Sequence, residues 1–247
     1  MATKNKINAV ILCGGAGTRF YPVTKKLPKV MADIHGKPFL DILIEHYLRQ
    51  GIARFILCTG YRSDYIKNYY QKSKLADYIL YSEEKNPLGT GGAVKNAEPL
   101  ILSNDFIVLN GDSFCDIDID PIIHFHSQLP DAYATCVLTP SDERTDTGGV
   151  IIDNASSRIL SFQEKNNDLK KPYISTGIYV FNKKILEMMP KNQTFSLEYL
   201  LFPQLANKGF YGYVANKKLI DIGTPERYKD ALDFFHSLKN RIGVYGE

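Results

Sequence analysis

The stretch Ala9-Val10-Ile11-Leu12-Cys13-Gly14-Gly15-Ala16-Gly17-Thr18-Arg19 decides the expected fold, and Pro28-Lys29 follows it after a short gap. Residues 9–12 form an apolar run with the length of one buried parallel strand. The glycines that follow permit positive φ angles and a close approach of the backbone to a ligand. Successive backbone N–H groups in such a loop make a concave anion site. Arg19 adds a fork of donors and Lys29 a mobile charge, so we predict a phosphate-binding mouth at a strand's carboxyl end.

The order of residues in this loop separates it from two common phosphate loops. It reads Gly-Gly-x-Gly-Thr-Arg, whereas dinucleotide folds need Gly-x-Gly-x-x-Gly and P-loops need Lys followed by Ser or Thr. Taken alone, the loop could also be a simple glycine turn between two elements. Together with Pro22 and Pro28-Lys29, the pattern resembles the signature of sugar-1-phosphate nucleotidyltransferases.

Composition indicates an ordinary globular protein. The 247 residues are 44% hydrophobic and 23% charged, and we expect one domain over residues 1–247. The net charge of +3 gives no reason to expect a nucleic-acid or membrane partner, and no run approaches ~18 apolar residues. The four cysteines are far apart, which predicts reduced thiols in a cytoplasmic protein rather than a disulfide or zinc framework. A homo-oligomer is compatible with the sequence.

Apolar periodicity predicts alternating strands and helices. This run of βαβ units predicts an α/β fold, a Rossmann-like three-layer sandwich with a mostly parallel, mixed central sheet. We expect residues 142–172 to form a small hairpin lid over the carboxyl edge of the sheet. The predicted strands are 9–12, 53–59, 78–81, 105–109, 132–139, 148–153, 159–163, 174–181, 210–215 and 219–222, and the predicted helices are 39–50, 63–72, 90–102, 120–128, 195–208 and 225–239.

A second glycine-rich stretch, Pro87-Leu88-Gly89-Thr90-Gly91-Gly92-Ala93, precedes a predicted helix. Its glycines permit close approach to a ring or ribose, and a helix N-terminus favours negative charge. A flexible loop that leads into the helix is the alternative. The stretch resembles the nucleotide loop of the same family. That resemblance implies a nucleotide site formed by Leu12, Cys13, Gly14, Gly15, Gly17, Thr18, Arg19, Glu84, Pro87, Gly89 and Thr90.

Glu84 gives an indication of the base. The family tends to place a base-reading Gln or Glu at this position, five residues before Gly89. A carboxylate can accept two hydrogen bonds from guanine N1–H and N2–H₂, whereas uracil offers one donor on that edge. The residue type therefore favours GTP, with a solvated surface carboxylate as the alternative.

Two aspartates are candidate metal ligands. Asp112 ends the segment Asn110-Gly111-Asp112 after a predicted strand, and Asp221 begins Asp221-Ile222-Gly223-Thr224-Pro225. An Asx-turn at the strand end is the alternative for Asp112. The family resemblance implies that both bind Mg²⁺, which prefers one or two carboxylates together with substrate phosphates. If the sheet is parallel at both positions, the two side chains lie at the same edge.

The segment Phe162-Gln163-Glu164-Lys165 resembles the family motif in which Lys binds the sugar phosphate and Glu holds sugar hydroxyls. By itself, a Glu-Lys pair at a strand end is more often a solvated surface pair. The resemblance implies a sugar-phosphate site formed by Gly149, Glu164, Lys165, Ser175 and Thr176. Many relatives have Asn at the position of Ser175 and Ala at that of Cys13.

The family catalyses attack of a sugar 1-phosphate on the α-phosphorus of an NTP, which gives an NDP-sugar and pyrophosphate. The resemblance implies that Arg19 binds the leaving pyrophosphate, Lys29 the α-phosphate and Lys165 the incoming phosphate, with Asp112 as the fourth catalytic residue. Phosphoryl transfer depends on positioning and charge neutralisation, so no protein nucleophile is required.

Several segments resemble one group within the family, the D-glycero-α-D-manno-heptose 1-phosphate guanylyltransferases. GTP and that heptose 1-phosphate are therefore the favoured substrates. A hexose or N-acetylmuramate 1-phosphate uridylyltransferase and a non-catalytic regulatory subunit are the alternatives. The segments that carry this resemblance are Gly36-Lys37-Pro38-Phe39-Leu40, Gly60-Tyr61, Phe195-Ser196-Leu197-Glu198 and Ile220-Asp221-Ile222-Gly223-Thr224-Pro225-Glu226.

Overall fold

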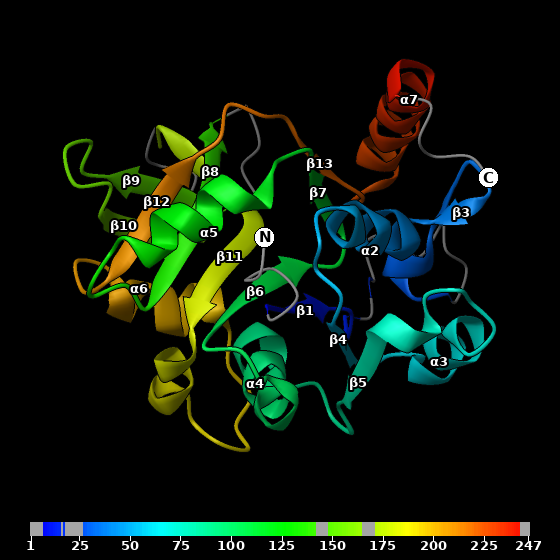
Figure 1. The fold of residues 1–247 in the computed structure, drawn as a ribbon, viewed down its shortest axis with the longest axis horizontal. Helices are drawn as coiled ribbons and strands as arrows, with labels where there is room; N and C mark the ends of the chain where they lie inside the picture. The colour runs from blue at the N-terminus through cyan, green and yellow to red at the C-terminus, as the bar shows by residue number, and fades with distance from the viewer. Residues whose placement is uncertain (1–6, 16, 18–26, 142–147, 165–170, 243–247) are drawn as a thin grey trace.

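The computed structural model describes residues 7–15, 17, 27–141, 148–164 and 171–242. Within these residues, helices cover a central sheet of nine strands (Figure 1). Seven of them run in the order β10-β9-β11-β6-β1-β4-β5, and β8 and β12 continue the sheet from β11. The α/β prediction and its mixed central sheet are confirmed.

One half of the sheet is parallel and follows the predicted βαβ units. Its inner strands β1, β4 and β6 are buried on both faces, which explains why the sequence shows continuous apolar runs there rather than alternation, whereas the edge strand β5 is only partly buried. They are β1 (Asn8–Leu12), β4 (Phe55–Thr59), β5 (Ile79–Glu83) and β6 (Asp105–Asn110), and the helices between them are α2 (Phe39–Arg49), α3 (Ser63–Tyr70) and α4 (Gly89–Asn96).

The other half is mainly antiparallel and is arranged around β11 (Tyr173–Asn182). This strand pairs antiparallel with β6 and with β8 (Ala134–Pro140), and β8 pairs parallel with β12 (Phe210–Val214). The predicted hairpin consists of β9 (Gly149–Ile152) and β10 (Ile159–Gln163). Because β9 also pairs with β11, the hairpin continues the central sheet. Residues 142–147 and 165–170 of the expected lid lie outside the described residues.

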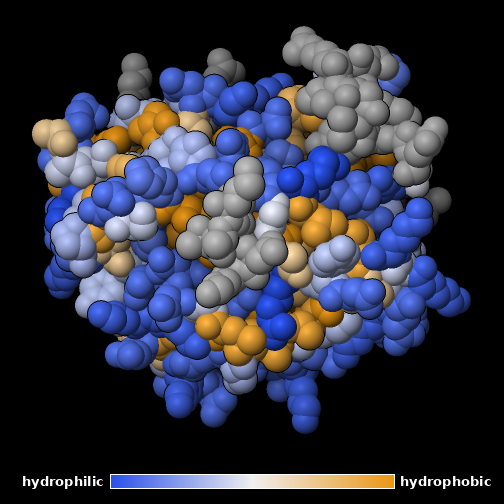
Figure 2. Space-filling model, viewed as in Figure 1, coloured by the Kyte–Doolittle hydropathy of each residue, from blue (hydrophilic) through white to orange (hydrophobic). Residues whose placement is uncertain are grey.

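Two apolar cores fill the two faces of the sheet. Alternate residues of β1 point to opposite faces, with Ile11 in one core and Val10 in the other. The first core packs under α2, α3, α5 (Ile119–Ser127) and α7 (Pro225–Ile242), and the second under α4, α6 (Phe202–Leu205) and η6 (Lys183–Met188). The surface on the side of Figure 1 is mostly hydrophilic, with smaller apolar groups between the polar side chains (Figure 2).

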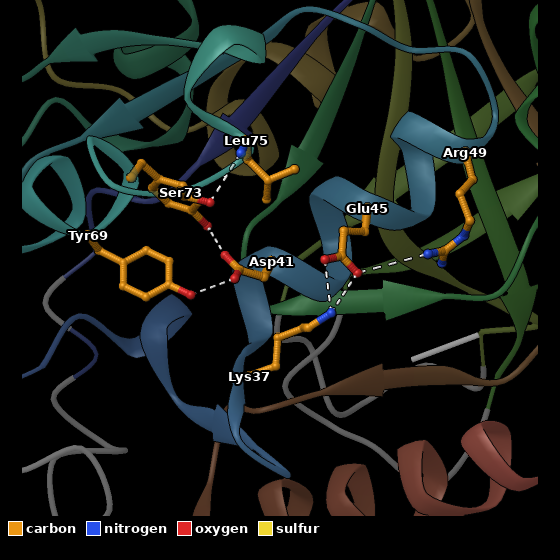
Figure 3. Close-up of polar contacts among 8 residues, drawn as sticks. Lys37, Asp41, Glu45, Arg49, Tyr69, Ser73 and Leu75 are labelled. Atoms are coloured by element: carbon orange, nitrogen blue, oxygen red, sulfur yellow. Dashed lines mark hydrogen bonds and ion pairs between the residues drawn. The ribbon is translucent and has the colours of Figure 1, made fainter. Parts of the chain in front are cut away.

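A buried carboxylate joins α2 to α3. Asp41 is 6% exposed and accepts hydrogen bonds of 2.6 Å from the hydroxyls of both Tyr69 and Tyr70 (Figure 3). Figure 3 also shows Glu45 on the same helix, paired with Lys37 and Arg49. Tyr69 and Tyr70 of α3 are therefore joined to α2 through Asp41.

Two predicted helices differ in the structure. The helix predicted at 90–102 ends at Asn96, and a short 3₁₀ turn, η5 (Glu98–Leu100), follows it because Pro99 cannot donate to the helix ladder. The helix predicted at 195–208 is a π-helical turn, η7 (Leu197–Leu201), followed by α6, which has Pro203 near its start.

Several short elements were not predicted. The most important is β7 (Ser113–Cys115), which pairs with the predicted strand β13 (Leu219–Asp221) in a separate two-stranded antiparallel sheet. The others are the hairpin of β2 (Asp33–Ile34) and β3 (Lys37–Pro38), and the 3₁₀ turns η3 (Lys29–Met31) and η4 (Ala76–Tyr78). In the described part of the chain, we find no helix with the length and apolar character needed to cross a membrane.

Candidate active site

Two cavities meet where β1 and β6 end. We call the first the loop cavity, because the glycine loop after β1 and the segment 84–93 line it; its volume is about 460 Å³. We call the second the hairpin cavity, because Gly148, Phe162 and Glu164 of the β9–β10 region line it; its volume is about 480 Å³. The residues that line both cavities are Lys29, Gly89, Thr90, Asn110, Asp112 and Gly223.

The loop cavity brings together the described residues of the predicted nucleotide site. Thr18 and Arg19 lie outside the described residues, so their predicted contacts stay predictions. The predicted residues that line this cavity are Leu12, Cys13, Gly14, Gly15, Gly17, Glu84, Pro87, Gly89 and Thr90.

Gly14 makes room for the Glu84 carboxylate. A Cβ atom at Gly14 would lie 2.6 Å from Glu84 Oε1, so any larger residue there would displace the Glu84 carboxylate. The other carboxylate oxygen accepts a hydrogen bond of 2.7 Å from the Leu88 backbone N–H. Among the described glycines of this loop, only Gly17 has a positive φ, 59°. Gly14 is therefore important because it lets the Glu84 carboxylate come close to the backbone, and not because it adopts an unusual backbone angle.

The environment of Glu84 favours hydrogen bonding to a donor. Burial raises the pKa of its carboxyl, while the bond from Leu88 acts in the opposite direction. The half-buried group is held by one oxygen and lines the loop cavity. The nearby Cys13 is not a candidate nucleophile, because burial raises the pKa of its thiol. Cys58, Cys115 and Cys136 are also buried free thiols.

Lys29 and Asp112 form an ion pair among the residues that line both cavities, which we call the shared floor. Lys29 Nζ lies 2.5 Å from Asp112 Oδ2, and the Ser113 hydroxyl donates to Asp112 Oδ1 at 3.2 Å. Burial alone would raise the pKa of the Asp112 carboxyl. The Lys29 ammonium and the bond from Ser113 outweigh burial and hold that pKa below its usual value. Asp112 is therefore an ionised oxygen donor that faces both cavities.

Asp221 reaches this floor by a route that differs from the prediction. We expected Asp112 and Asp221 at one sheet edge on the condition that the sheet is parallel at both positions. That condition is not met, because Asp221 ends β13, which pairs antiparallel with β7 in the separate small sheet. Asp221 is the register partner of Ser113, and the Ile222 N–H donates to the Asp112 carbonyl at 3.1 Å. This pairing, rather than a common sheet edge, brings the two aspartates together.

A second cation lies beside Asp221. Arg227 Nη1 is 3.3 Å from Asp221 Oδ1, and the Gly223 N–H donates to the same oxygen at 2.8 Å. A Cβ atom at Gly223 would lie 2.7 Å from Asp221 Oδ1 and 3.8 Å from Lys29 Nζ. Two aspartates and two basic side chains thus surround one small space.

The oxygen donors here fit Mg²⁺ if a substrate supplies the remaining ligands. No cluster of three or more His, Cys, Asp or Glu that could hold a metal occurs among the described residues. Mg²⁺, however, is commonly held by one or two carboxylates and substrate phosphates rather than by an all-protein cage. Asp112 and Asp221 provide those two carboxylates.

The hairpin cavity collects the described residues of the predicted sugar side. Glu164, Ser175 and Thr176 line it, and Lys165 lies outside the described residues. Gly149 is buried in β9, where a Cβ atom would meet the Lys171 side chain, and its neighbour Gly148 lines the cavity instead.

The hydroxyls of Ser175 and Thr176 both make hydrogen bonds within the protein. The Thr176 hydroxyl is buried and donates to the Val137 carbonyl at 3.0 Å, so it is already committed. Ser175 Oγ lies 3.0 Å from the Tyr179 hydroxyl, and both residues line the cavity. Ser175 Oγ also accepts hydrogen bonds from the Gly177 N–H at 3.2 Å and from Cys136 Sγ at 3.4 Å, so both hydroxyls are already engaged within the protein.

Sequence reasoning did not assign three polar residues that line the hairpin cavity: Asn110, Glu198 and Arg227. Each is close to a recognised segment. Asn110 precedes Gly111-Asp112, Glu198 ends Phe195-Ser196-Leu197-Glu198, and Arg227 follows Asp221-Ile222-Gly223-Thr224-Pro225-Glu226. The signal that could have found them is this adjacency, because residues next to a motif are carried to the same place.

Comparison with known proteins identifies the family of this chain. Residues 8–237 match the Nucleotidyl transferase family. The chain belongs to this family. The nucleotidyl transferase is 36% identical over 226 residues to the D-glycero-α-D-manno-heptose 1-phosphate guanylyltransferase of Aneurinibacillus thermoaerophilus, which covers 91% of this chain and 96% of that protein.

Two further comparisons give the same result. The enzyme of the same name from Campylobacter jejuni is 35% identical over 234 residues, with 95% of this chain and 100% of that protein covered. The crystal structure of HddC from Yersinia pseudotuberculosis complexed with GMP-PN has a TM-score of 0.80 and 36% identity. It covers 93% of this nucleotidyl transferase and 99% of the HddC chain. The predicted family is confirmed.

Proposed function

We propose that this nucleotidyl transferase transfers GMP from GTP to a sugar 1-phosphate, with D-glycero-α-D-manno-heptose 1-phosphate as the favoured acceptor. The observation that carries the proposal is the floor that the two cavities share. Lys29 and Asp112 line both, so a nucleotide in the loop cavity and a sugar phosphate in the hairpin cavity would meet over them. The guanylyltransferase names of the relatives support the choice of GTP and heptose.

The reaction exchanges one phosphorus–oxygen bond for another. An oxygen of the sugar phosphate attacks the α-phosphorus of GTP, and the bond to pyrophosphate breaks as the new bond forms. The attacking oxygen is already an anion, so catalysis needs positioning and charge neutralisation rather than a protein nucleophile.

The residues around the shared floor suit that task. Lys29 would neutralise charge on the α-phosphate, and Glu84 in the loop cavity would accept the donors of guanine. Arg19 would bind the pyrophosphate and Lys165 the incoming phosphate. Asp112 and Asp221 would hold Mg²⁺, whose charge would stabilise the transferring phosphoryl group when it is bound.

A product screen tests the proposal. Purified protein is incubated with each of four NTPs and a panel of sugar 1-phosphates, with pyrophosphate release and nucleotide-sugar mass as readouts. We expect the highest kcat/KM for GTP with the heptose 1-phosphate. A preference for UTP with a hexose or muramate phosphate would identify a uridylyltransferase instead. No pyrophosphate from any combination would contradict the enzymatic role.

A further inference from the structure

A segment of the second half of the chain, residues 193–198, lies directly against the glycine-rich loop 87–92. The Thr194 hydroxyl donates to the Pro87 carbonyl at 3.1 Å, and the Phe195 N–H donates to the Leu88 carbonyl at 2.9 Å. The Gly91 N–H returns a bond of 3.0 Å to the Phe195 carbonyl. The two segments are thus joined by backbone bonds in both directions.

The glycines of this loop serve that contact. A Cβ atom at Gly91 would lie 2.0 Å from the Phe195 ring, and one at Gly89 would lie 2.5 Å from the Phe195 carbonyl oxygen. Sequence reasoning predicted that these glycines let a ligand approach. In the structure Gly89 and Gly91 let residue 195 approach, and Gly89 also lines the loop cavity.

The contact ends at Glu198, where two hydroxyls donate to one carboxylate oxygen. Glu198 Oε2 accepts hydrogen bonds of 2.6 Å from both Thr90 Oγ1 and Ser196 Oγ. The Leu197 N–H donates to Thr90 Oγ1 at 2.9 Å, and the Glu198 N–H donates to Ser196 Oγ at 3.0 Å. The side chain of Glu198 is therefore fixed from both sides.

The other carboxylate oxygen of Glu198, Oε1, can still accept hydrogen bonds. An ionised carboxylate accepts only, and each oxygen has about two lone-pair positions. Oε2 uses both, and no described residue donates to Oε1 in the structure. Glu198 lines the hairpin cavity and does not line the loop cavity. A donor that reaches Oε1 must therefore come from a ligand or water in the hairpin cavity.

We propose that Glu198 is a specificity-determining residue for the acceptor: its Oε1 accepts a hydrogen bond from a hydroxyl of the sugar ring. The inference rests on the proposed function and adds to it a residue that selects among sugars. The phosphate group of the acceptor is excluded as the partner, because it would be repelled by the carboxylate. Neutral hydroxyls are the donors that a sugar 1-phosphate offers.

The charges of the hairpin cavity agree with this orientation. Glu164 and Glu198 are acidic, while Lys29 and Arg227 are basic and adjoin Asp112 and Asp221. A sugar 1-phosphate fits such a cavity with its phosphate toward the basic side chains and its hydroxyls toward the two glutamates. The Thr90 bond also means that a residue of the nucleotide loop holds the group that reads the sugar.

The test combines Glu198→Gln with deoxy analogues of the sugar 1-phosphate that the wild-type enzyme uses best. Gln keeps the shape but presents an amide N–H₂ where Oε1 stood. We expect kcat/KM for the sugar phosphate to fall about tenfold to a hundredfold, with the Kd of GTP from calorimetry unchanged. Glu187→Gln, which changes an exposed glutamate of η6, is the matched control.

The analogues identify the hydroxyl. We expect one deoxy analogue to lose as much kcat/KM with wild-type enzyme as the parent sugar loses with E198Q, and to lose little more with E198Q itself. Three results would overturn the inference. They are an unchanged kcat/KM in E198Q, a loss of GTP affinity equal to the loss of kcat/KM, or a further full loss of kcat/KM in E198Q for every deoxy analogue. Far-UV circular dichroism and Tm establish that E198Q is folded. If wild-type enzyme used no sugar 1-phosphate, the proposed function would fail, and the inference with it.

Discussion

Lys29 occupies the space beside Asp112 where we expect a shared metal ion, and Arg227 does the same beside Asp221. If Asp112 and Asp221 hold one Mg²⁺, Asp112→Asn and Asp221→Asn should each lower kcat by about 10²-fold or more. The double variant should be little worse than either single variant, because each removes the same ion. Turnover measured against Mg²⁺ concentration, with EDTA as the metal-free condition, checks this.

The control for charge alone is Asp77→Asn, at an exposed aspartate of η4. Its turnover and Mg²⁺ dependence should equal those of the wild-type enzyme. Far-UV circular dichroism should show that all variants are folded. Full activity in EDTA, or near-normal turnover of either single variant, would mean that these aspartates serve only the β7–β13 pairing.

The predicted role of Glu84 in base recognition can be tested separately from the role of the two aspartates. If its carboxylate reads guanine, Glu84→Gln should reduce the ratio of kcat/KM for GTP over UTP. A buried acceptor that loses its donors costs about 1–3 kcal/mol, which is roughly a fivefold to hundredfold change in that ratio. Glu83→Gln is the matched control, because Glu83 is the preceding residue and its carboxylate pairs with Lys67 instead. An unchanged ratio in E84Q would remove Glu84 from base recognition.

Among the secondary-structure elements, α2 and α3 depend on the buried Asp41. Asp41→Ala would leave the hydroxyls of Tyr69 and Tyr70 without their acceptor, at a cost of about 2–4 kcal/mol in the free energy of unfolding. Asp41→Asn keeps an acceptor and removes the buried charge, so we expect a change within about 1 kcal/mol. Urea unfolding of both variants provides the measurement. Equal losses in the two variants would contradict the hydrogen-bond account.

The same carboxylate gives a pH dependence with a defined sign. Burial raises the pKa of Asp41 above its usual value, although the two phenol bonds lower it. The folded state then binds the proton more readily than the unfolded state, so ionisation of Asp41 costs stability as the pH rises. Relative to D41N, the wild-type protein should gain stability as the pH falls from 7 toward 4. A constant difference would show that the pKa is the same in both states.

Elements with a clear apolar period were predictable, and elements held by distant contacts were not. The strands β1, β4 and β6 and the helices α2 and α5 follow from local patterns, since each buries a face or both faces. The three-residue strand β7 is too short to show a period, and its pairing with the predicted strand β13 joins residues about 100 positions apart. The helix predicted at 195–208, with a kink or break at Pro203, is only partly formed as η7 and α6, and its first part is fixed by Thr90 and by the loop 87–92.

The same difference applies to the candidate site. The loop residues from Leu12 to Gly17 and from Pro87 to Thr90 were found because glycine and charge at fixed spacing suggest a phosphate site. Glu198 and Arg227 carry no such pattern. Their place in the hairpin cavity follows from hydrogen bonds to Thr90 and Asp221, which only the folded chain reveals.

For the whole molecule, the site lies where the parallel and antiparallel halves of the sheet meet. The parallel half supplies the loop after β1, and β11 of the other half supplies Ser175 and Thr176. The junction requires Gly177 in β11, which has a φ of 75° and lies where the pairing of β11 with β8 is irregular. A Cβ atom there would be 2.7 Å from the Asn110 amide at the end of β6. One glycine thus lets the two halves close around a common floor.

Stability of the whole molecule should decline in mild acid because two histidines are buried beneath the same face of the sheet. Burial lowers the pKa of His46, and it lowers the pKa of His126, which the Asp105 carboxylate raises only in part. Below about pH 6.5 the unfolded chain binds protons that the folded chain does not. The free energy of unfolding should therefore fall between pH 7.5 and 5.5, by up to about 1.4 kcal/mol per histidine and pH unit.

Urea unfolding across that pH range, with one variant for each histidine, tests the source of the decline. In His46→Gln the amide replaces Nε2, which lies 3.2 Å from the Ile117 carbonyl, and in His126→Asn it replaces Nδ1, which lies 2.8 Å from Thr135 Oγ1. Each variant should show a smaller slope with pH, whatever its absolute stability. His124→Gln, at an exposed position of α5, should keep the wild-type slope. A slope in both His46→Gln and His126→Asn that equals the wild-type slope would show that neither buried histidine is held neutral, since each variant removes one histidine and leaves the other titrating groups in place.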